Sequence, residues 1–134
     1  MSLITETLLK VRYAETDQMG VVHHSNYIKY IEVARVDWLS ATGTSYRAME
    51  ESGIMMPVIS LDIKYKKSAY FDDQLVIKTK LRKIPTVKII FDYEIYNENQ
   101  ELLTIASTTL AFMDSETRKP IACPPYLLEK MKCS

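Results

Sequence analysis

A single long helical segment followed by four alternating segments restricts the folds open to this chain. Apolar side chains between residues 25 and 43 follow the 4-3-4-3 spacing of one helix face, at Tyr27, Ile31, Ala34, Trp38 and Ala41. Five more apolar residues widen that face, namely Ile28, Tyr30, Val33, Val36 and Leu39. A helix this apolar is usually buried on most sides. From residue 59 onward the apolar period changes to two, which predicts strands with one buried face.

The order of these segments predicts an α+β fold. We expect strands over residues 7–13, 59–65, 75–82, 87–96 and 102–114, and short helices over 45–52 and 126–132. Ser25 or Asn26 is the expected N-cap of the long helix, and Gly43 its stop. Strands and helices do not alternate, which argues against a parallel doubly wound sheet. The pattern favours a five-stranded antiparallel sheet wrapped around one long central helix, in a single domain over residues 1–134.

Composition excludes several classes of function. Lys plus Arg and Asp plus Glu each number 17, a balance that argues against a general nucleic-acid binder. No run approaches the ~20 apolar residues that a membrane span needs. The first six residues lack the basic and apolar regions of a signal peptide. Cys123 and Cys133 are expected to be reduced and unbridged. We therefore expect a cytoplasmic protein without a membrane span.

The loop before the long helix carries the residues with the clearest chemistry. A carboxylate such as Asp17 activates water as a general base, or attacks a carbonyl as a nucleophile. The N–H groups at the helix start, around His24 to Asn26, would stabilise a negative oxygen. Gly20 allows the loop to turn tightly. Taken alone, an aspartate in a Thr-Asp-x-x-Gly loop is more typical of a cap or a turn.

The run VRYAETDQMGVVHHSNY over residues 11–27 closely resembles the active-site signature of the 4-hydroxybenzoyl-CoA thioesterase family. It is most similar to the Tol-Pal-associated (YbgC-like) acyl-CoA thioesterases. The helix residues Tyr30, Glu32, Ala34 and Arg35 and the run YKKSAYFDD over residues 65–73 are similar as well, so the resemblance covers nearly the whole chain. It implies the hot-dog fold and the hydrolysis of an acyl-CoA to a free acid and coenzyme A, with no cofactor.

The resemblance also implies a set of site residues. Asp17 is the expected catalytic carboxylate, with His24 and Tyr13 as further site residues and His23 as the weaker histidine. Contacts to the substrate are expected from Gly20 and Ser25, and contacts to the coenzyme A phosphates from the basic residues Lys66, Lys67, Arg82, Lys83 and Lys88. The hairpin arginines of the 4-hydroxybenzoyl-CoA enzyme would fall near Pro85 and Thr86, where this chain has none.

Several alternatives stay open at this stage. Tyr13 also suits a packed strand-end aromatic, His24 a solvated first-turn residue, and the basic residues an ordinary charged surface. Acyl carrier protein shares the phosphopantetheine arm of coenzyme A, so an acyl-ACP thioesterase fits, as does a non-catalytic acyl-binding protein. His23 and His24 lack a third ligand at metal-binding spacing, so we expect no metal. The family implies a homodimer or homotetramer with its sites at subunit interfaces.

Overall fold

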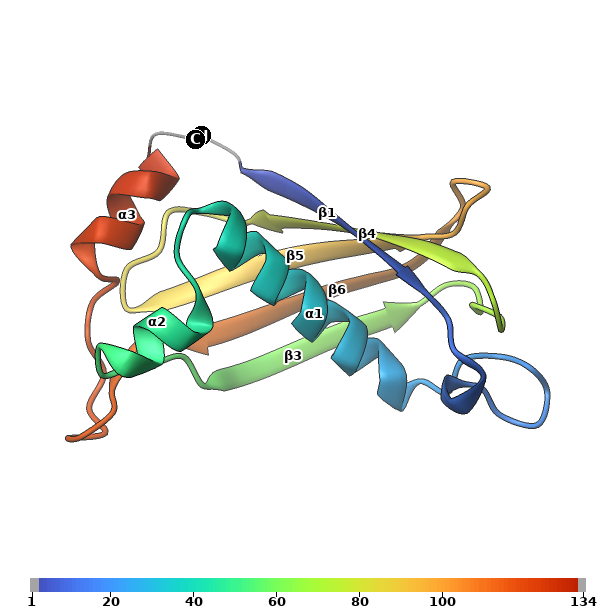
Figure 1. The fold of residues 1–134 in the computed structure, drawn as a ribbon, viewed down its shortest axis with the longest axis horizontal. Coiled ribbons are helices and arrows are strands. Elements are labelled where there is room, and N and C mark those ends of the chain that lie inside the picture. The colour runs from blue at the N-terminus through green and yellow to red at the C-terminus, as the bar shows by residue number, and fades with distance from the viewer. Residues whose placement is uncertain (1–2, 133–134) are drawn as a thin grey trace.

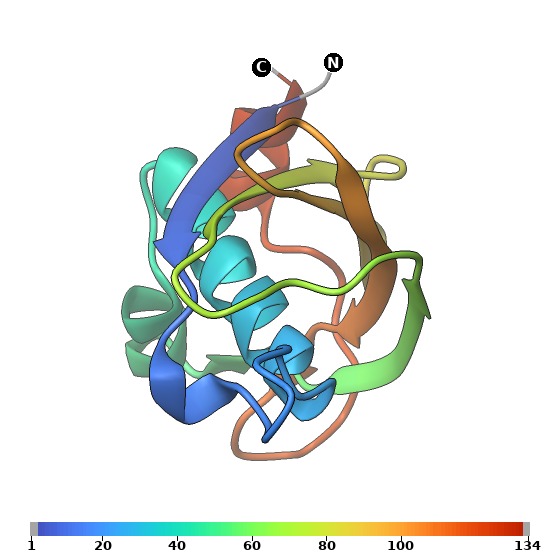
Figure 2. The same ribbon diagram turned by 90° about the vertical axis from the view of Figure 1, so that its right-hand side faces the viewer.

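A five-stranded antiparallel sheet curls around helix α1, as the ribbon views in Figures 1 and 2 show. The structure is a computed structural model that describes residues 3–132. Its helical elements are the 3-10 turn η1 (Tyr13–Glu15), α1 (Ser25–Ala41), α2 (Tyr46–Glu51) and α3 (Pro125–Lys132). Its strands are β1 (Ile4–Lys10), β2 (Ile54–Met55), β3 (Val58–Tyr65), β4 (Gln74–Leu81), β5 (Lys88–Tyr96), β6 (Leu102–Ala111) and β7 (Met113–Asp114).

The strand order across the main sheet is β1-β4-β5-β6-β3, and every neighbouring pair is antiparallel. The short strands β2 and β7 form a separate pair. This arrangement confirms the expected α+β fold with five antiparallel strands around one long helix. The expected helix from residue 25 toward Gly43 is also confirmed, since α1 spans Ser25–Ala41.

The core lies between α1 and the concave face of the sheet. Alternate residues of β4 and β5 point into it, and Trp38 on α1 meets the Phe91 ring edge-on at 5.0 Å. The buried residues of α1 include four of the five on the face predicted from the 4-3-4-3 spacing, namely Tyr27, Ile31, Ala34 and Trp38. Burial of this single stripe against a curved sheet explains why the helix is central to the fold.

The wider apolar face of α1 is only partly buried within the chain, which corrects one expectation. Tyr30 and Leu39 are buried, whereas Ile28, Val33 and Val36 stay between 42% and 49% exposed. The sheet covers only one side of the helix, so these three side chains have no neighbour of the same subunit to bury them. Strand β3 shows the same exposure, and seven of its eight residues are exposed.

The first strand begins and ends earlier than residues 7–13. It spans Ile4–Lys10, because its partner β4 begins at Gln74, opposite Lys10. The inward face of β1 carries the buried Thr7, while Leu8 points outward and is 66% exposed. At these two positions polarity runs opposite to burial, so the burial of Thr7 gives no sign of the strand in the sequence. Tyr13, predicted in the strand, lies in η1.

The helix start is also built differently from the prediction. The N-cap is His24, not Ser25 or Asn26, and its side chain makes no capping bond. Instead, the ring of His23 accepts the Ser25 backbone N–H through Nδ1 (3.2 Å). Asn26 turns inward and donates from Nδ2 to the Glu15 carbonyl (2.9 Å). A histidine ring thus takes the role that serine and asparagine usually have at this position.

The two ends of the sheet carry different loops. Lys10 pairs with Gln74 at one end, and the loop of residues 11–24 follows there. Ile4 pairs with Lys80 near the other end, where β4 turns into β5. Figure 1 shows the two loops on opposite sides of the view. Arg82, Lys83 and Lys88 belong to the β4–β5 turn or border it, so within one chain they lie far from Asp17.

Cys123 is buried and free of any disulfide, and burial raises the pKa of its thiol to about 11. A thiol with so high a pKa is a poor nucleophile at neutral pH. Cys133 lies outside the described residues. Across residues 3–132, no helix is both long and apolar enough to cross a membrane.

Candidate active site

The loop between η1 and α1 is closed at its base by backbone contacts. Thr16 and Val22 form an antiparallel bridge, and the His23 N–H donates to the Glu15 carbonyl (2.9 Å). At the tip, the Gly20 N–H donates to the Asp17 carbonyl (3.0 Å). Gly20 has a φ of +78°, a conformation that side chains with a Cβ seldom adopt. The loop is therefore a short, closed turn that presents Asp17 at a fixed place.

Asp17 is exposed, and only one of its carboxylate oxygens is engaged. Oδ1 accepts the Met19 N–H (2.8 Å) and, at 3.4 Å, the Val21 N–H. No hydrogen bond from the described residues reaches Oδ2. The turn thus orients the carboxylate through Oδ1 and leaves Oδ2 without a partner among the described residues. Asp17 therefore stabilises the turn, as an aspartate in such a loop commonly does, and keeps an oxygen for chemistry.

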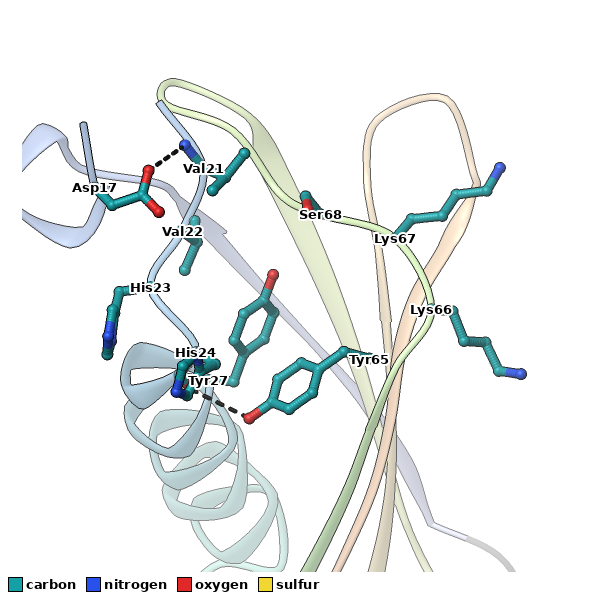
Figure 3. Close-up of a pocket in the computed structure, with 10 residues that line it drawn as sticks. All are labelled: Asp17, Val21, Val22, His23, His24, Tyr27, Tyr65, Lys66, Lys67 and Ser68. Atoms are coloured by element: carbon teal, nitrogen blue, oxygen red, sulfur yellow. Dashed lines mark hydrogen bonds between the residues drawn. The ribbon is translucent and has the colours of Figure 1, made fainter. Parts of the chain in front are cut away.

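Asp17 stands at the edge of a cleft of about 570 Å³. Figure 3 shows the lining residues, which come from the loop, the start of α1, the end of β3 and the segment after it. They are Asp17, Val21, Val22, His23, His24, Tyr27, Tyr65, Lys66, Lys67 and Ser68. A cleft of this size accommodates a small-molecule ligand.

His24 and Tyr65 lie at the centre of this cleft. The His24 ring stacks on the His23 ring at 4.4 Å and meets the Tyr65 ring edge-on at 6.1 Å. The Tyr65 hydroxyl points to the His24 carbonyl, at 3.4 Å (Figure 3). Tyr27 adds a second edge-on contact to Tyr65 at 5.2 Å. The cleft therefore combines aromatic walls with a carboxylate at its edge.

The backbone at the helix start leaves one amide available. The N–H groups of His23, Ser25, Asn26 and Tyr27 all have acceptors within the chain. The His24 N–H has none among the described residues. An amide at the N-terminus of a helix favours negative charge through the helix dipole. This N–H is thus a candidate backbone donor for an oxygen that becomes negative.

The predicted site residues divide into two groups. The cleft brings together Asp17, His24, Lys66 and Lys67, whereas Tyr13, Gly20 and Ser25 do not line it. Tyr13 is 77% exposed and packs edge-on against Phe71 at 5.5 Å. Gly20 shapes the loop, and the Ser25 N–H is taken by His23. The roles of these residues toward a substrate stay predictions.

The basic residues are also spread out. Figure 3 shows the Lys66 and Lys67 side chains extending away from Asp17. Lys67 forms an ion pair with Glu101 (2.9 Å). Arg82 pairs with Asp92 (2.8 Å) at the other end of the sheet, next to Lys83. If Arg82, Lys83 and Lys88 bind coenzyme A at this cleft, they must come from another subunit.

Three residues that shape the site were missed in the sequence. Tyr65 lines the cleft, but its position at the end of an alternating segment carried no functional signal. Glu15 and Asn26 fasten the loop to α1 through the Glu15 carbonyl. Glu15 follows Arg12 by three residues, a spacing that suits a side-chain contact across a short turn. Within residues 3–132, no three His, Cys, Asp or Glu side chains form a group able to hold a metal ion.

Comparison with known proteins identifies the family. The sequence model of the thioesterase-like superfamily matches residues 11–131, nearly the whole chain. The chain belongs to the thioesterase-like superfamily. The family resemblance predicted from residues 11–27 is therefore confirmed. A YbgC acyl-CoA thioesterase of Haemophilus influenzae is 31% identical to it, over 87% of this chain and 85% of the relative.

Solved structures of other members of this superfamily share the fold. A DHNA-CoA thioesterase from Staphylococcus aureus superposes with a TM-score of 0.92 at 40% identity, over 97% of this chain and 89% of the other. A 1,4-dihydroxy-2-naphthoyl-CoA thioesterase from Synechocystis superposes with a TM-score of 0.89 at 23% identity, covering 96% of each chain. These matches confirm the hot-dog fold. The relative from Haemophilus influenzae and the staphylococcal enzyme are both named as thioesterases, which supports the expected thioester hydrolase activity.

Proposed function

We propose that the chain hydrolyses acyl-CoA thioesters to a carboxylic acid and coenzyme A, with Asp17 as the catalytic carboxylate. The observation that carries this proposal is the state of Asp17 at the edge of the cleft. Backbone amides hold Oδ1, while Oδ2 is left to accept a proton from water. A positioned general base contributes on the order of 10²–10⁴ in rate. The same oxygen also suits direct attack on the thioester carbonyl, so both routes depend on this one atom.

The helix start supplies the second element of the chemistry. As water adds to the thioester carbonyl, negative charge develops on the carbonyl oxygen. The His24 N–H lies at the N-terminus of α1 and has no acceptor of its own among the described residues. It is therefore our proposed donor to that oxygen, with the His24 ring as a further donor from the side of the cleft.

The aromatic walls of the cleft favour an aromatic acyl group. The rings of Tyr27, Tyr65 and His24 meet edge-on in this cleft, an arrangement that suits contact with another ring. The similar staphylococcal enzyme acts on DHNA-CoA. We therefore propose an aromatic acyl-CoA such as DHNA-CoA as the substrate. Lys66, whose side chain carries no ion pair within the described residues, is the proposed contact for a phosphate of the donor.

A panel of thioesters tests the function directly. DHNA-CoA, 4-hydroxybenzoyl-CoA, acetyl-CoA, palmitoyl-CoA and a matching acyl-ACP are compared by thiol release, with and without a chelator. We expect the aromatic acyl-CoAs to give the highest kcat/KM, unchanged by the chelator, because the proposal needs no metal or cofactor. Absence of thiol release from every substrate, with binding retained, would favour the non-catalytic acyl-binding alternative. A clearly higher kcat/KM for acyl-ACP than for acyl-CoA would show that acyl carrier protein, not coenzyme A, carries the acyl group.

The proposal includes a homo-oligomer in the cytoplasm. Exposed apolar side chains on α1 and along β3 need a partner, and an open sheet edge is a ready site for pairing with a second copy. The other edge strand, β1, packs against α1: Thr7 donates to Asp37 (2.8 Å), and Trp38 donates to the carbonyl of Leu3 just before the strand (3.0 Å). Pairing through β3 is therefore the arrangement that we propose.

A further inference from the structure

Glu15 is a buried carboxylate two residues before the proposed catalytic one. It is only 7% exposed, although it lies in a short turn at the surface end of the sheet. Its Oε1 accepts the Arg12 backbone N–H (2.9 Å) and the Tyr30 hydroxyl (2.8 Å). Its Oε2 accepts the Arg12 guanidinium through Nε (3.1 Å) and Nη2 (2.9 Å). Both oxygens are thus fully occupied, so Glu15 has no lone pair positioned for substrate.

The backbone of Glu15 holds the other side of the loop. Its carbonyl accepts the His23 N–H (2.9 Å) and the Asn26 Nδ2 (2.9 Å). His23 is the neighbour of His24, whose N–H is the proposed donor to the oxyanion. Asn26 and Tyr30 belong to the first turns of α1. One residue therefore connects the turn before Asp17 with the helix start that follows it.

These contacts fix the separation between the two proposed reacting groups. Asp17 and His24 lie in the same loop, and the closure of its base contributes to how far apart their polar groups stand. A misplacement of about 1 Å between catalytic groups costs on the order of 10²-fold in rate. An ion pair with a solvent-exposed arginine alone would be weak. The added hydrogen bonds from a backbone amide and a buried tyrosine make this carboxylate a rigid anchor.

We propose that Glu15 is a positioning residue, whose buried carboxylate holds the Asp17 loop against α1 in the geometry that hydrolysis requires. The inference rests on the proposed function, because it assigns Glu15 a role through Asp17 and His24. Glu15 itself touches neither substrate nor water in this role.

The electrostatics of the cluster agree with a charged carboxylate. Burial alone would raise the pKa of Glu15, but hydrogen bonds from the Arg12 amide, the Arg12 guanidinium and the Tyr30 hydroxyl outweigh it and lower that pKa. Burial and the neighbouring carboxylate raise the pKa of Tyr30, which keeps its proton available for donation. The anchor is therefore intact throughout the neutral range.

Substitution of Glu15 tests this role in the intact protein. Glu15→Gln keeps the size of the side chain but places an amide against the Arg12 guanidinium. We expect kcat to fall by about 10-fold or more, while KM changes by less than about threefold. Tyr30→Phe removes one hydrogen bond to Glu15 and keeps the carboxylate, so a smaller fall in kcat is expected. If Glu15→Gln does not fold, Tyr30→Phe is the variant that tests the role of the cluster. Glu98→Gln, on an exposed turn, is the matched control and should change neither constant.

A double substitution separates positioning from general structural damage. If Glu15 acts by placing Asp17, then Glu15→Gln should change the residual kcat of Asp17→Asn by less than about twofold. An equal fall of kcat in both backgrounds would overturn the inference, as would folded Glu15→Gln and Tyr30→Phe variants with wild-type kcat. Wild-type kcat in Asp17→Asn alone would instead overturn the proposed function, so the two failures are distinguishable. Circular dichroism and thermal unfolding establish that each variant is folded.

Discussion

At the scale of single residues, Asp17, His23 and His24 make different contacts although they lie in one loop. Asp17 uses Oδ1 to hold its own turn and leaves Oδ2 free. His23 uses its ring to cap the helix, and so His24 is left with an unused N–H. The two adjacent histidines therefore differ in the contacts they make within the chain.

The difference between the two histidines leads to a prediction. His24→Ala removes the ring but keeps the backbone N–H, whereas His24→Pro removes both. Proline is compatible with the φ of −60° at this position. If the ring contributes, His24→Ala lowers kcat by about 10-fold while KM changes little. His24→Pro should lower kcat further, by about 10²-fold or more, because the oxyanion donor is lost.

Steady-state kinetics on these variants and on His23→Ala decide between ring and backbone. A near-normal kcat in His24→Ala with a large fall in His24→Pro would assign the role to the amide alone. A larger fall in kcat for His23→Ala than for His24→Ala would mean that His23, not His24, is the site histidine.

The buried carboxylate of Glu15 gives a second prediction at this scale, on stability in acid. Hydrogen bonds and the Arg12 charge lower the folded-state pKa of Glu15 despite its burial. Its stabilising contribution is therefore fully present above the unfolded pKa of about 4.3 and is lost as the pH falls through the lower folded value. Urea unfolding should show that the difference in the free energy of unfolding between the wild type and Glu15→Gln shrinks below about pH 4. A difference that stays constant down to pH 2 would contradict this.

At the scale of elements, the sequence predicted the helices and strands that show a regular spacing of apolar residues. It missed the features that depend on contacts with distant parts of the chain. The spacing of Tyr27, Ile31, Ala34 and Trp38 located α1, because one face of that helix meets the sheet. The bounds of β1 were misplaced by about three residues, because they are set by the length of its partner β4, which begins opposite Lys10. The motif located Asp17 and His24 in the cleft. Tyr65 and Glu15 were missed because their roles come from contacts distant in sequence or from burial within a turn.

The contact between α1 and α2 gives a prediction on stability. Arg35 is buried, and its guanidinium donates to two tyrosine hydroxyls, Tyr46 through Nε (2.8 Å) and Tyr93 through Nη1 (3.5 Å). No carboxylate pairs with it among the described residues. Tyr46→Phe should therefore lower the free energy of unfolding by about 1–3 kcal/mol, since a buried cation loses its shortest hydrogen bond.

Urea unfolding of Tyr46→Phe, measured beside Tyr126→Phe, tests this contribution. Tyr126 lies on α3 and is 41% exposed, so the loss of its hydroxyl should change stability by less than about 0.5 kcal/mol. Equal stability of both variants and the wild type would mean that Arg35 finds another acceptor.

At the scale of the whole molecule, the proposed assembly rests on apolar residues that stay exposed in the single chain. A single chain exposes apolar side chains on β3, at Ile59 and Leu61, and on one side of α1. Alternation along β3 predicted a strand but not an open edge, because a period of two does not reveal whether a strand lies inside a sheet or at its border. The expected oligomer would explain both features.

Assembly through β3 predicts that Ile59→Lys dissociates the oligomer. Ile59 is 52% exposed in the single chain, and a charge there would be buried without a partner in the interface. Leu8→Lys, on the other edge strand β1, is the matched control, since Leu8 is 66% exposed as well. Sedimentation velocity at micromolar concentration should show an oligomer for the wild type and Leu8→Lys, and a monomer for Ile59→Lys. A stable, active wild-type monomer would contradict the assembly.

The catalytic role of Asp17 is tested most directly by the turnover number of Asp17→Asn. The asparagine keeps an oxygen to accept the Met19 N–H, so the turn survives, but the free carboxylate oxygen is lost. With the best thioester of the panel, kcat should fall on the order of 10²–10⁴-fold while the protein stays folded. A folded Asp17→Asn that releases thiol at the wild-type rate would show that this carboxylate does not carry the reaction.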